Sequence, residues 1–448
     1  MKRRSFLKAC CAAAGASSLP AAAFFNPLEG GRGSGHDVLV YLYLRGGIDG
    51  LHLVVPYAGP ERVAYEGRRG NMMIPGERLR PISAEWALHP RAGGGPGDNV
   101  DSNPRWLQRL WLENRLAIVH GAGMPTHLSR SHFDAQAWMD LGTPGTRATS
   151  QGWLTRYLEN ATGLPPALLS HAFGFASTQP LSLIGANDAF TVSSAQEFRV
   201  DGFHWSWNNS NPDLAGHQGA HHRIQSLWAP GSGPLEEAGR LAAEALAEMR
   251  SMEFADYQPE GGASYPGNTL GTQLRNLAQL IKEDTGVVAA TIDYGGWDTH
   301  EGQGMPNPGN AGHYDYYGNL LQGLAEGLDA FYTDLALSTQ GNLMNRVSVV
   351  ILSEFGRNVT GNQSSGTDHG YGNTLLALGG RVNGGQFYGE FPGLDKSSLF
   401  ENQDLDTTTD YRQVLAEALV RRMNVAPATL DAIFPNLDGY SPLGIFQE

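Results

Sequence analysis

The chain has 448 residues, of which 41% are hydrophobic, 17% are charged and 58 are glycine. This composition suits a loop-rich globular protein with one large core or two domains, and it excludes a coiled coil and a disordered tail. The formal net charge of −14 argues against nonspecific binding to nucleic acid.

The first thirty residues predict an export signal peptide and a linker. MKRRSFLKACCAAAGASSLPAAAFF has a basic start, a small-residue apolar segment and a cleavage site at residues 21–23. Arg3 and Arg4 begin a twin-arginine pattern, so we expect the twin-arginine translocase to export the folded chain to the periplasm or the cell exterior. The signal holds both cysteines, which leaves the mature chain without disulfides or thiolate metal ligands.

Removal of this signal leaves 27 basic residues against 45 acidic ones, a net charge of −18. We therefore expect no nucleic-acid partner. No later apolar run reaches the length of a membrane span, so we also expect no stable membrane span in the mature chain.

Buried strands and amphipathic helices alternate along the rest of the chain. Apolar runs closed by glycine or polar residues predict strands at residues 37–44, 116–120, 286–296, 346–354 and 374–380. Helical spacing of apolar residues predicts helices at 234–257, 269–284, 317–337 and 410–423. This alternation indicates an α/β fold, with a mostly parallel sheet covered by helices on both faces.

Two segments interrupt this pattern. Residues 186–232 are rich in Asn, His, Trp and Gly and lack periodicity, and residues 91–103 are rich in Gly. We expect a single domain over residues 36–448, with an irregular inserted cap or loop region at about 186–265.

Polar side chains recur where the predicted strands end, which is where ligands bind in open α/β sheets. We expect six of them to meet at one rim and hold one or two divalent metals, namely Asp49, Asp298, His300, Glu354, Asp368 and His369. Oxygen and nitrogen ligands favour zinc or manganese, with calcium or magnesium as alternatives. Each group also has an ordinary structural use, because Asp forms turns and caps and His occurs in many loops.

The segment PTHLSRSHFDAQ predicts a loop that enters a helix. Ser131 could act there as a nucleophile, with Ser129 nearby and Arg130 or Arg45 binding an anion. A helix N-terminus favours a phosphate or sulfate. Serine before a helix is, however, more commonly an N-cap.

Several long blocks, including LRGGIDGLHLVVPY, DYGGWDTHEGQ and SEFGRNVTGNQSSGTDHGYGNTLLALGG, resemble the domain-of-unknown-function 1501 family. The resemblance runs from about residue 38 to the end of the chain and is weakest at about 190–265. That family looks like a branch of the alkaline phosphatase and sulfatase superfamily. The resemblance implies a three-layer alkaline phosphatase-like fold with metals at the strand ends.

The superfamily pattern can be carried over to individual residues of this chain. It implies Asp49 as the first metal ligand, Ser131 as the nucleophile with Ser129 second, and Asp298 with His300 as the middle pair. The next Asp-His pair of the superfamily pattern aligns with Glu354 and Phe355. The histidine that comes last in the pattern, just before a strand, aligns with His369. Phe355 cannot bind a metal, so one ligand is missing unless Asp368 replaces it. A cysteine-derived formylglycine is excluded because the mature chain has no cysteine.

Two functions remain from the sequence. The first is an exported metal-dependent hydrolase of phosphate or sulfate esters, which would act on a small-molecule or glycan substrate. The second is a periplasmic or cell-surface binding or assembly protein that retains the fold without catalysis. An oxidoreductase has little support, because RGGIDG lacks the G-x-G-x-x-G spacing.

Overall fold

The computed structural model describes residues 35–94, 103–165, 170–193, 256–303 and 315–448, with a few isolated positions between them. The predicted signal at residues 1–30 and the predicted helix at 234–257 therefore lie almost wholly outside the described residues. So does most of the predicted insertion at 186–265. Among the described residues, no helix combines the length and the apolar character needed to cross a bilayer.

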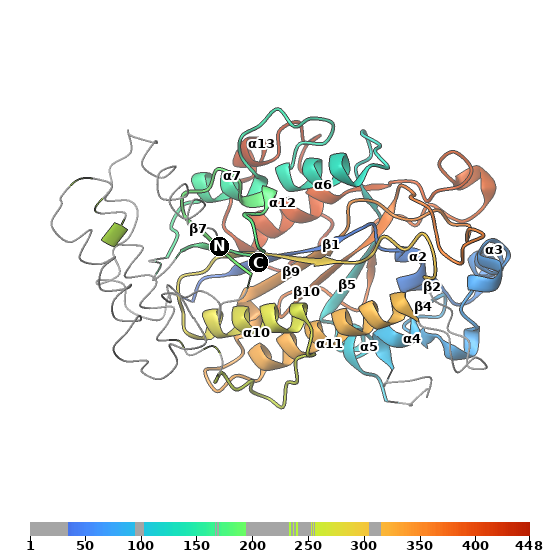
Figure 1. Cartoon of the computed structure of the whole chain (residues 1–448), viewed down its shortest axis with the longest axis horizontal. Coiled ribbons are helices and arrows are strands. Elements are labelled where there is room, and N and C mark those ends of the chain that lie inside the picture. Colours follow the sequence, from blue (N-terminus) through green and yellow to red (C-terminus); the bar gives the residue numbers. More distant parts are fainter. Residues whose placement is uncertain are drawn as a thin grey trace, which may run out of the picture.

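A large mixed sheet forms the centre of the described chain (Figure 1). Its strand order is β11-β5-β10-β9-β1-β8-β6-β7, and β12 pairs with β5 at one edge. The strands are β1 (Val38–Arg45), β5 (Leu116–Gly123), β6 (Ala172–Phe175), β7 (Ala189–Val192), β8 (Ala289–Gly295), β9 (Val347–Leu352), β10 (Asn373–Gly379), β11 (Phe387–Tyr388) and β12 (Thr409–Asp410).

Most neighbouring strands in this sheet are parallel. The central strand β1 pairs in parallel with β8 and β9, whereas β10 pairs antiparallel with both β9 and β5. The two antiparallel pairings give β5 the same direction as β9. The carboxyl ends of β1, β5, β8 and β9 therefore share one edge of the sheet, where β10 begins.

The strand β1 shows why the sheet is buried on both faces. Alternate side chains of a strand point to opposite faces. The even-numbered residues from Val38 to Leu44 pack into one hydrophobic core, and Leu39, Tyr41 and Tyr43 pack into the other. A strand with apolar residues at every position is stable only when both faces are covered.

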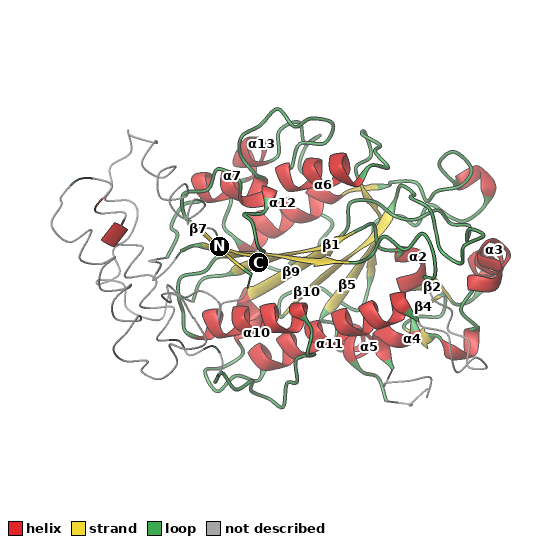
Figure 2. Ribbon diagram, in the orientation of Figure 1, coloured by secondary structure: helices red, strands yellow, loops and turns green. Residues whose placement is uncertain are grey.

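Two layers of helices cover these faces (Figures 1 and 2). One layer contains α4 (Pro90–Gly93), α5 (Trp106–Leu112), α10 (Thr269–Lys282) and α11 (Tyr316–Ala336), and the other contains α6 (His132–Leu141), α7 (Trp153–Asn160), α12 (Tyr411–Arg422) and α13 (Leu430–Ile433). Asn268 and Asp315 cap α10 and α11 by accepting hydrogen bonds from Gly271 N and Gly318 N. The predicted α/β class with helices on both faces is confirmed.

Shorter elements lie beside this core. A second sheet contains β2 (Val54–Pro56), β4 (Trp86–Leu88) and β3 (Arg80–Pro81), with α2 (Gly50–Leu53) and α3 (Gly59–Arg69) close by in the chain. The 3-10 helices among the described residues are η2 (Gly70–Met72), η3 (Gly76–Arg78), η4 (Leu181–Leu183), η7 (Leu343–Arg346), η8 (Lys396–Ser398) and η9 (Pro427–Thr429).

All five predicted strands are present, with ends shifted by a few residues. The strand β7 falls at the start of the predicted irregular insertion, where it pairs in parallel with β6 and extends the main sheet. This segment is therefore regular because pairing with a neighbouring strand organises it, a contact that local periodicity does not reveal.

Candidate metal centre

Four polar side chains converge at the carboxyl edge of the sheet. Asp298 and His300 follow β8, His132 begins α6 after β5, and His369 precedes β10. The Asp298 carboxylate lies at the centre: its Oδ1 is 3.1 Å from His369 Nε2 and 3.2 Å from His300 Nε2, and its Oδ2 is 3.3 Å from His132 Nε2. Ligand atoms of His132, Asp298 and His369 all lie within 4.8 Å of one another.

The second nitrogen of each imidazole faces an oxygen acceptor. His132 Nδ1 is 2.7 Å from Glu354 Oε1, and His300 Nδ1 is 2.9 Å from Asp368 Oδ1. His369 Nδ1 is 2.6 Å from the carbonyl oxygen of Arg130. Carboxylate and carbonyl oxygens only accept hydrogen bonds, so each Nδ1 carries the proton and donates it.

This tautomer leaves three Nε2 lone pairs facing the same region. His300 Nε2 and His369 Nε2 are only 2.8 Å apart, a distance at which two lone pairs repel unless a proton or a cation lies between them. Histidine ligands of metals usually donate their other ring N–H to a carboxylate or a carbonyl, as these three do. His132, Asp298 and His369 therefore fit a divalent metal, and His300 Nε2 lies beside them.

Arg357 fixes the position of Asp298 and the loops around it. Its guanidinium is fully buried and donates to Asp298 Oδ1 at 2.8 Å. The other donors reach carbonyl oxygens on three loops, those of Gly47 at 2.6 Å, Trp297 at 3.0 Å and Thr367 at 3.0 Å. Partial burial would raise the pKa of Asp298, but the hydrogen bond and the charge of Arg357 hold it well below its usual range. Asp298 is therefore an anion at neutral pH.

Protonation differs among the imidazoles. The hydrogen bond to Glu354 raises the pKa of His132, whereas burial lowers the pKa of His369. His369 is therefore the more readily available of the two as a neutral ligand. A metal at the site would displace the proton that the raised pKa of His132 favours.

Glu354 and Asp368, two of the six predicted ligands, lie behind the imidazoles. Glu354 is buried, and its Oε1 also accepts hydrogen bonds from Gly46 N at 2.9 Å and Gln136 Nε2 at 2.6 Å. Asp368 Oδ1 accepts from Asn362 Nδ2 at 3.1 Å as well as from His300. Both carboxylates therefore orient histidines rather than join the central group.

Asp49 does not join the cluster, contrary to its predicted role. Its Oδ2 and Oδ1 pair with Arg69 at 2.5 and 2.8 Å, and Oδ2 also accepts from Gln303 Nε2 at 2.8 Å. Asp49 is fully buried and also caps α2 by accepting from His52 N. Both carboxylate oxygens are thus used, so Asp49 holds Arg69 and the Gln303 loop in place.

Neither arginine predicted to bind an anion is free to do so. Arg130 pairs with Glu401 at 2.8 Å and with Asp404. Arg45 pairs with Asp140 at 2.7 Å and with Asp293 at 2.9 Å. These carboxylates come from distant parts of the chain and neutralise both guanidinium groups.

The two serines differ in their contacts. Ser129 Oγ accepts a hydrogen bond from Ser131 N at 3.1 Å. Ser131 occupies the N-cap position of α6, but its side chain makes no capping hydrogen bond. Ser131 therefore presents a hydroxyl at a helix N-terminus, directly before His132 in the chain.

His132, Arg69 and Gln303 were absent from the predicted site. His132 lies in the loop-to-helix segment that we predicted after the second strand. Its position in the first turn of a helix at the carboxyl edge of the sheet is the sequence feature that could have identified it. Arg69 and Gln303 carry no sequence signal, because their partner Asp49 is remote in the chain.

The fold and the cluster define an α/β protein with a candidate metal centre at the carboxyl edge of its sheet. The chain belongs to the family DUF1501, described as protein of unknown function, whose profile matches residues 36–434. None of the curated proteins compared with the sequence matches it.

Proposed function

We propose that this protein is a metal-dependent hydrolase of phosphate or sulfate esters. The observation that carries the proposal is the convergence of three imidazole Nε2 atoms on the Asp298 carboxylate, each ring held by an acceptor at Nδ1. In this preorganised set the Nε2 atoms of His300 and His369 repel each other, and a bound cation would relieve that repulsion.

Three nitrogen ligands and one carboxylate favour zinc or manganese over calcium or magnesium. His132, Asp298, His300 and His369 would hold one ion. A divalent metal there acts as a Lewis acid that neutralises charge on an ester oxyanion. Glu354, Asp368 and the Arg130 carbonyl would keep the rings in the binding tautomer.

Ser131 is the proposed nucleophile. Its Oγ would attack the phosphorus or sulfur atom, and the alcohol of the ester would leave with the electron pair of the broken bond. Water would then cleave the serine ester, releasing the acid and restoring the hydroxyl. The helix N-terminus of α6 favours an anion at this position.

The mostly parallel sheet between two helical layers supports an alkaline phosphatase-like fold, as the family resemblance implies. We further propose that the twin-arginine signal directs the folded chain to the periplasm or the cell exterior. Folding before export would allow the metal to bind in the cytoplasm.

A binding or assembly protein without catalysis is the second candidate. The observation that favours it is that Arg45 and Arg130 are each paired with two carboxylates. The site would then bind metal, while Arg45 and Arg130 stay bound to carboxylates and not to an ester anion.

Ester hydrolysis by the mature protein tests the proposal. Purified protein supplied with zinc or manganese would be assayed against chromogenic aryl phosphates and aryl sulfates. We expect turnover that Ser131→Ala abolishes and Ser129→Ala, the matched serine control, retains. Full activity in Ser131→Ala would remove the nucleophile from the proposal. Bound metal with no turnover on any ester would favour the binding protein.

A further inference from the structure

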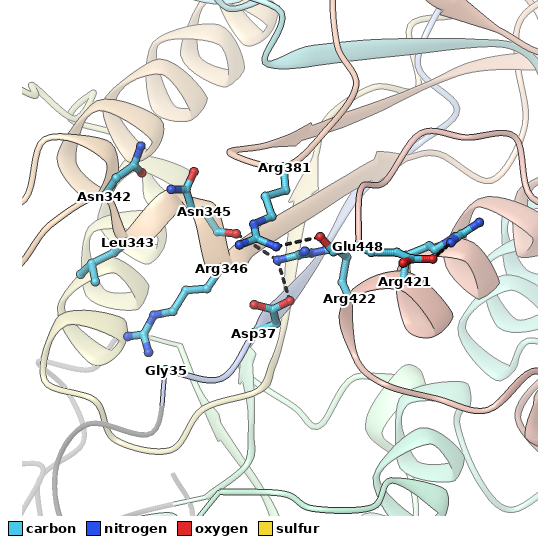
Figure 3. Close-up of a pocket in the computed structure, with 10 residues that line it drawn as sticks. All are labelled: Gly35, Asp37, Asn342, Leu343, Asn345, Arg346, Arg381, Arg421, Arg422 and Glu448. Atoms are coloured by element: carbon cyan, nitrogen blue, oxygen red, sulfur yellow. Dashed lines mark hydrogen bonds and ion pairs between the residues drawn. The ribbon is translucent and has the colours of Figure 1, made fainter.

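A pocket at the opposite edge of the sheet is rich in arginine. Asp37 precedes β1, Arg346 precedes β9, and Arg381 follows β10, so these residues lie at the amino ends of β1 and β9. With Arg421, Arg422 and Glu448 they line a cavity of about 310 Å³, which we call the arginine pocket (Figure 3). This volume is at the small end of ligand pockets.

The charge of the arginine pocket is opposite to that of the protein. Four arginines and two acidic side chains line it, whereas the chain as a whole has a net charge of −14. Asp284, outside the lining, lies 3.4 Å from Arg346 Nη1. Even with this third side-chain carboxylate, the four guanidinium groups outnumber the side-chain carboxylates around the pocket.

Arg422 forms the fixed side of the pocket. Its guanidinium pairs with Asp37 at 2.6 Å and donates to the carbonyl oxygen of Asn345 at 3.0 Å. Only 4% of its side chain is exposed. Burial and the charge of Arg381 lower the pKa of Arg422. The two guanidinium groups therefore repel each other, and an anion between them would relieve this repulsion.

Glu448 supplies the oxygens that Arg381 and Arg421 now bind. Arg381 Nη1 donates to the main-chain oxygen of Glu448 at 2.7 Å, and Arg421 pairs with the Glu448 side-chain carboxylate. Figure 3 shows Arg381 and Arg422 side by side, between Asp37 and Glu448. The Glu448 side chain, which pairs with Arg421, is 82% exposed, so that side chain is easily displaced.

We propose that the arginine pocket binds a small phosphate-type oxyanion, with Arg381 and Arg422 as its main contacts and Glu448 giving way to it. Guanidinium groups bind such oxyanions through paired N–H donors. Glu448 occupies one donor of Arg381, and Arg422 Nε is buried without a hydrogen-bond partner. This pocket is independent of the metal centre, because it lies at the other end of the strands.

Calorimetric titration of the protein with inorganic phosphate tests the proposal. We expect saturable binding that Arg381→Ala weakens at least about tenfold. Arg381 is exposed, so its removal should leave the fold intact. The matched control is Arg68→Ala, which removes a half-buried arginine bound to the Leu394 carbonyl elsewhere in the molecule and should not change the affinity.

Two further variants distinguish phosphate binding in this pocket from binding at other sites of the protein. Asp298→Ala removes the centre of the metal cluster and should leave the pocket's phosphate affinity unchanged. This result tests the arginine pocket independently of the proposed hydrolase activity. Glu448→Ala should raise the affinity, because it removes the carboxylate that now pairs with Arg421 beside the main contacts.

No phosphate binding up to about 10 mM, or equal binding by wild type and Arg381→Ala, would overturn the proposal. A lipid headgroup presents the same oxyanion chemistry. Co-sedimentation with vesicles of phosphatidylglycerol and phosphatidylcholine, without any response to free phosphate, would therefore contradict a small free ligand.

Discussion

The Nε2 atoms of His300 and His369 lie 2.8 Å apart, although each ring donates its only neutral-state proton from Nδ1 to another oxygen. Two neutral imidazoles in this arrangement would repel each other. The loops nevertheless hold them in place through Asp368, the Arg130 carbonyl and the central Asp298 carboxylate. This geometry is expected of a pair of metal ligands, and the following predictions depend on it.

Removal of one imidazole should weaken metal binding without unfolding the protein. His300 is partly exposed, so His300→Ala should leave the core intact. We expect its zinc affinity to fall by at least about tenfold, measured by competition with a chelating dye. The control is His127→Ala, which removes an exposed histidine near α6 whose ring contacts Thr126 and Trp138 and none of the four cluster residues. Equal losses in both variants would contradict a specific site.

Glu354 should act on metal binding through His132. In Glu354→Gln the carboxylate becomes an amide, which makes the His132 imidazole less basic and a weaker ligand. We expect metal affinity to fall by about 10–100-fold in the same dye assay. Glu159→Gln, an exposed change on α7, is the control. An unchanged affinity in Glu354→Gln would show that His132 needs no carboxylate behind it.

Asp49 should contribute to stability and not to metal stoichiometry. Asp49→Asn leaves the fully buried Arg69 guanidinium without its carboxylate, which should cost about 3–5 kcal/mol of unfolding free energy. Denaturant unfolding measures this loss, and metal analysis of the folded variant should give the wild-type value.

The control for Asp49 is Asp134→Asn, which breaks the exposed pair with Arg147 and should cost less than about 1 kcal/mol. Loss of metal from Asp49→Asn without a loss of stability would instead make Asp49 a ligand, as the family resemblance implies.

His120 should make the protein less stable in acid. Burial among Trp86, Phe387 and Phe391 lowers the pKa of His120 to about 4. Its unfolded pKa is about 6.5, so between these values the unfolded state binds more protons and stability falls as pH falls. His120 should therefore account for about 2 kcal/mol of the stability lost between pH 7 and pH 5.

His120→Phe tests this pH dependence, because phenylalanine fills the same aromatic cluster without titrating. The difference in unfolding free energy between pH 7 and pH 5 should shrink in the variant. An identical pH dependence in both proteins would mean that His120 takes up its proton without unfolding.

The order of apolar and polar residues along the chain predicted the elements that depend on neighbouring residues. Fully apolar runs predicted the five main strands, and the expectation that polar side chains after the strands meet at one rim holds for Asp298, His300 and His369. His132 was placed in the right loop but not in the ligand set, because a histidine in the first helical turn has no distinctive spacing.

Partners that are distant in the chain could not be predicted. Arg130 and Asp404 come from separate elements, as do Arg45 and Asp140, and only the folded sheet brings them into contact. The same holds for Arg69 and Asp49. A charged residue after a strand is equally suited to bind a ligand or a buried counter-charge, and the tertiary structure decides between them.

Metal content of the purified mature protein tests the central claim most directly. Mass spectrometric metal analysis after dialysis should find about one divalent ion per chain in the wild type. It should find essentially none in Asp298→Ala, whose carboxylate lies between the three imidazoles. A wild-type protein that retains no divalent ion, or an Asp298→Ala variant that retains as much as the wild type, would contradict the account.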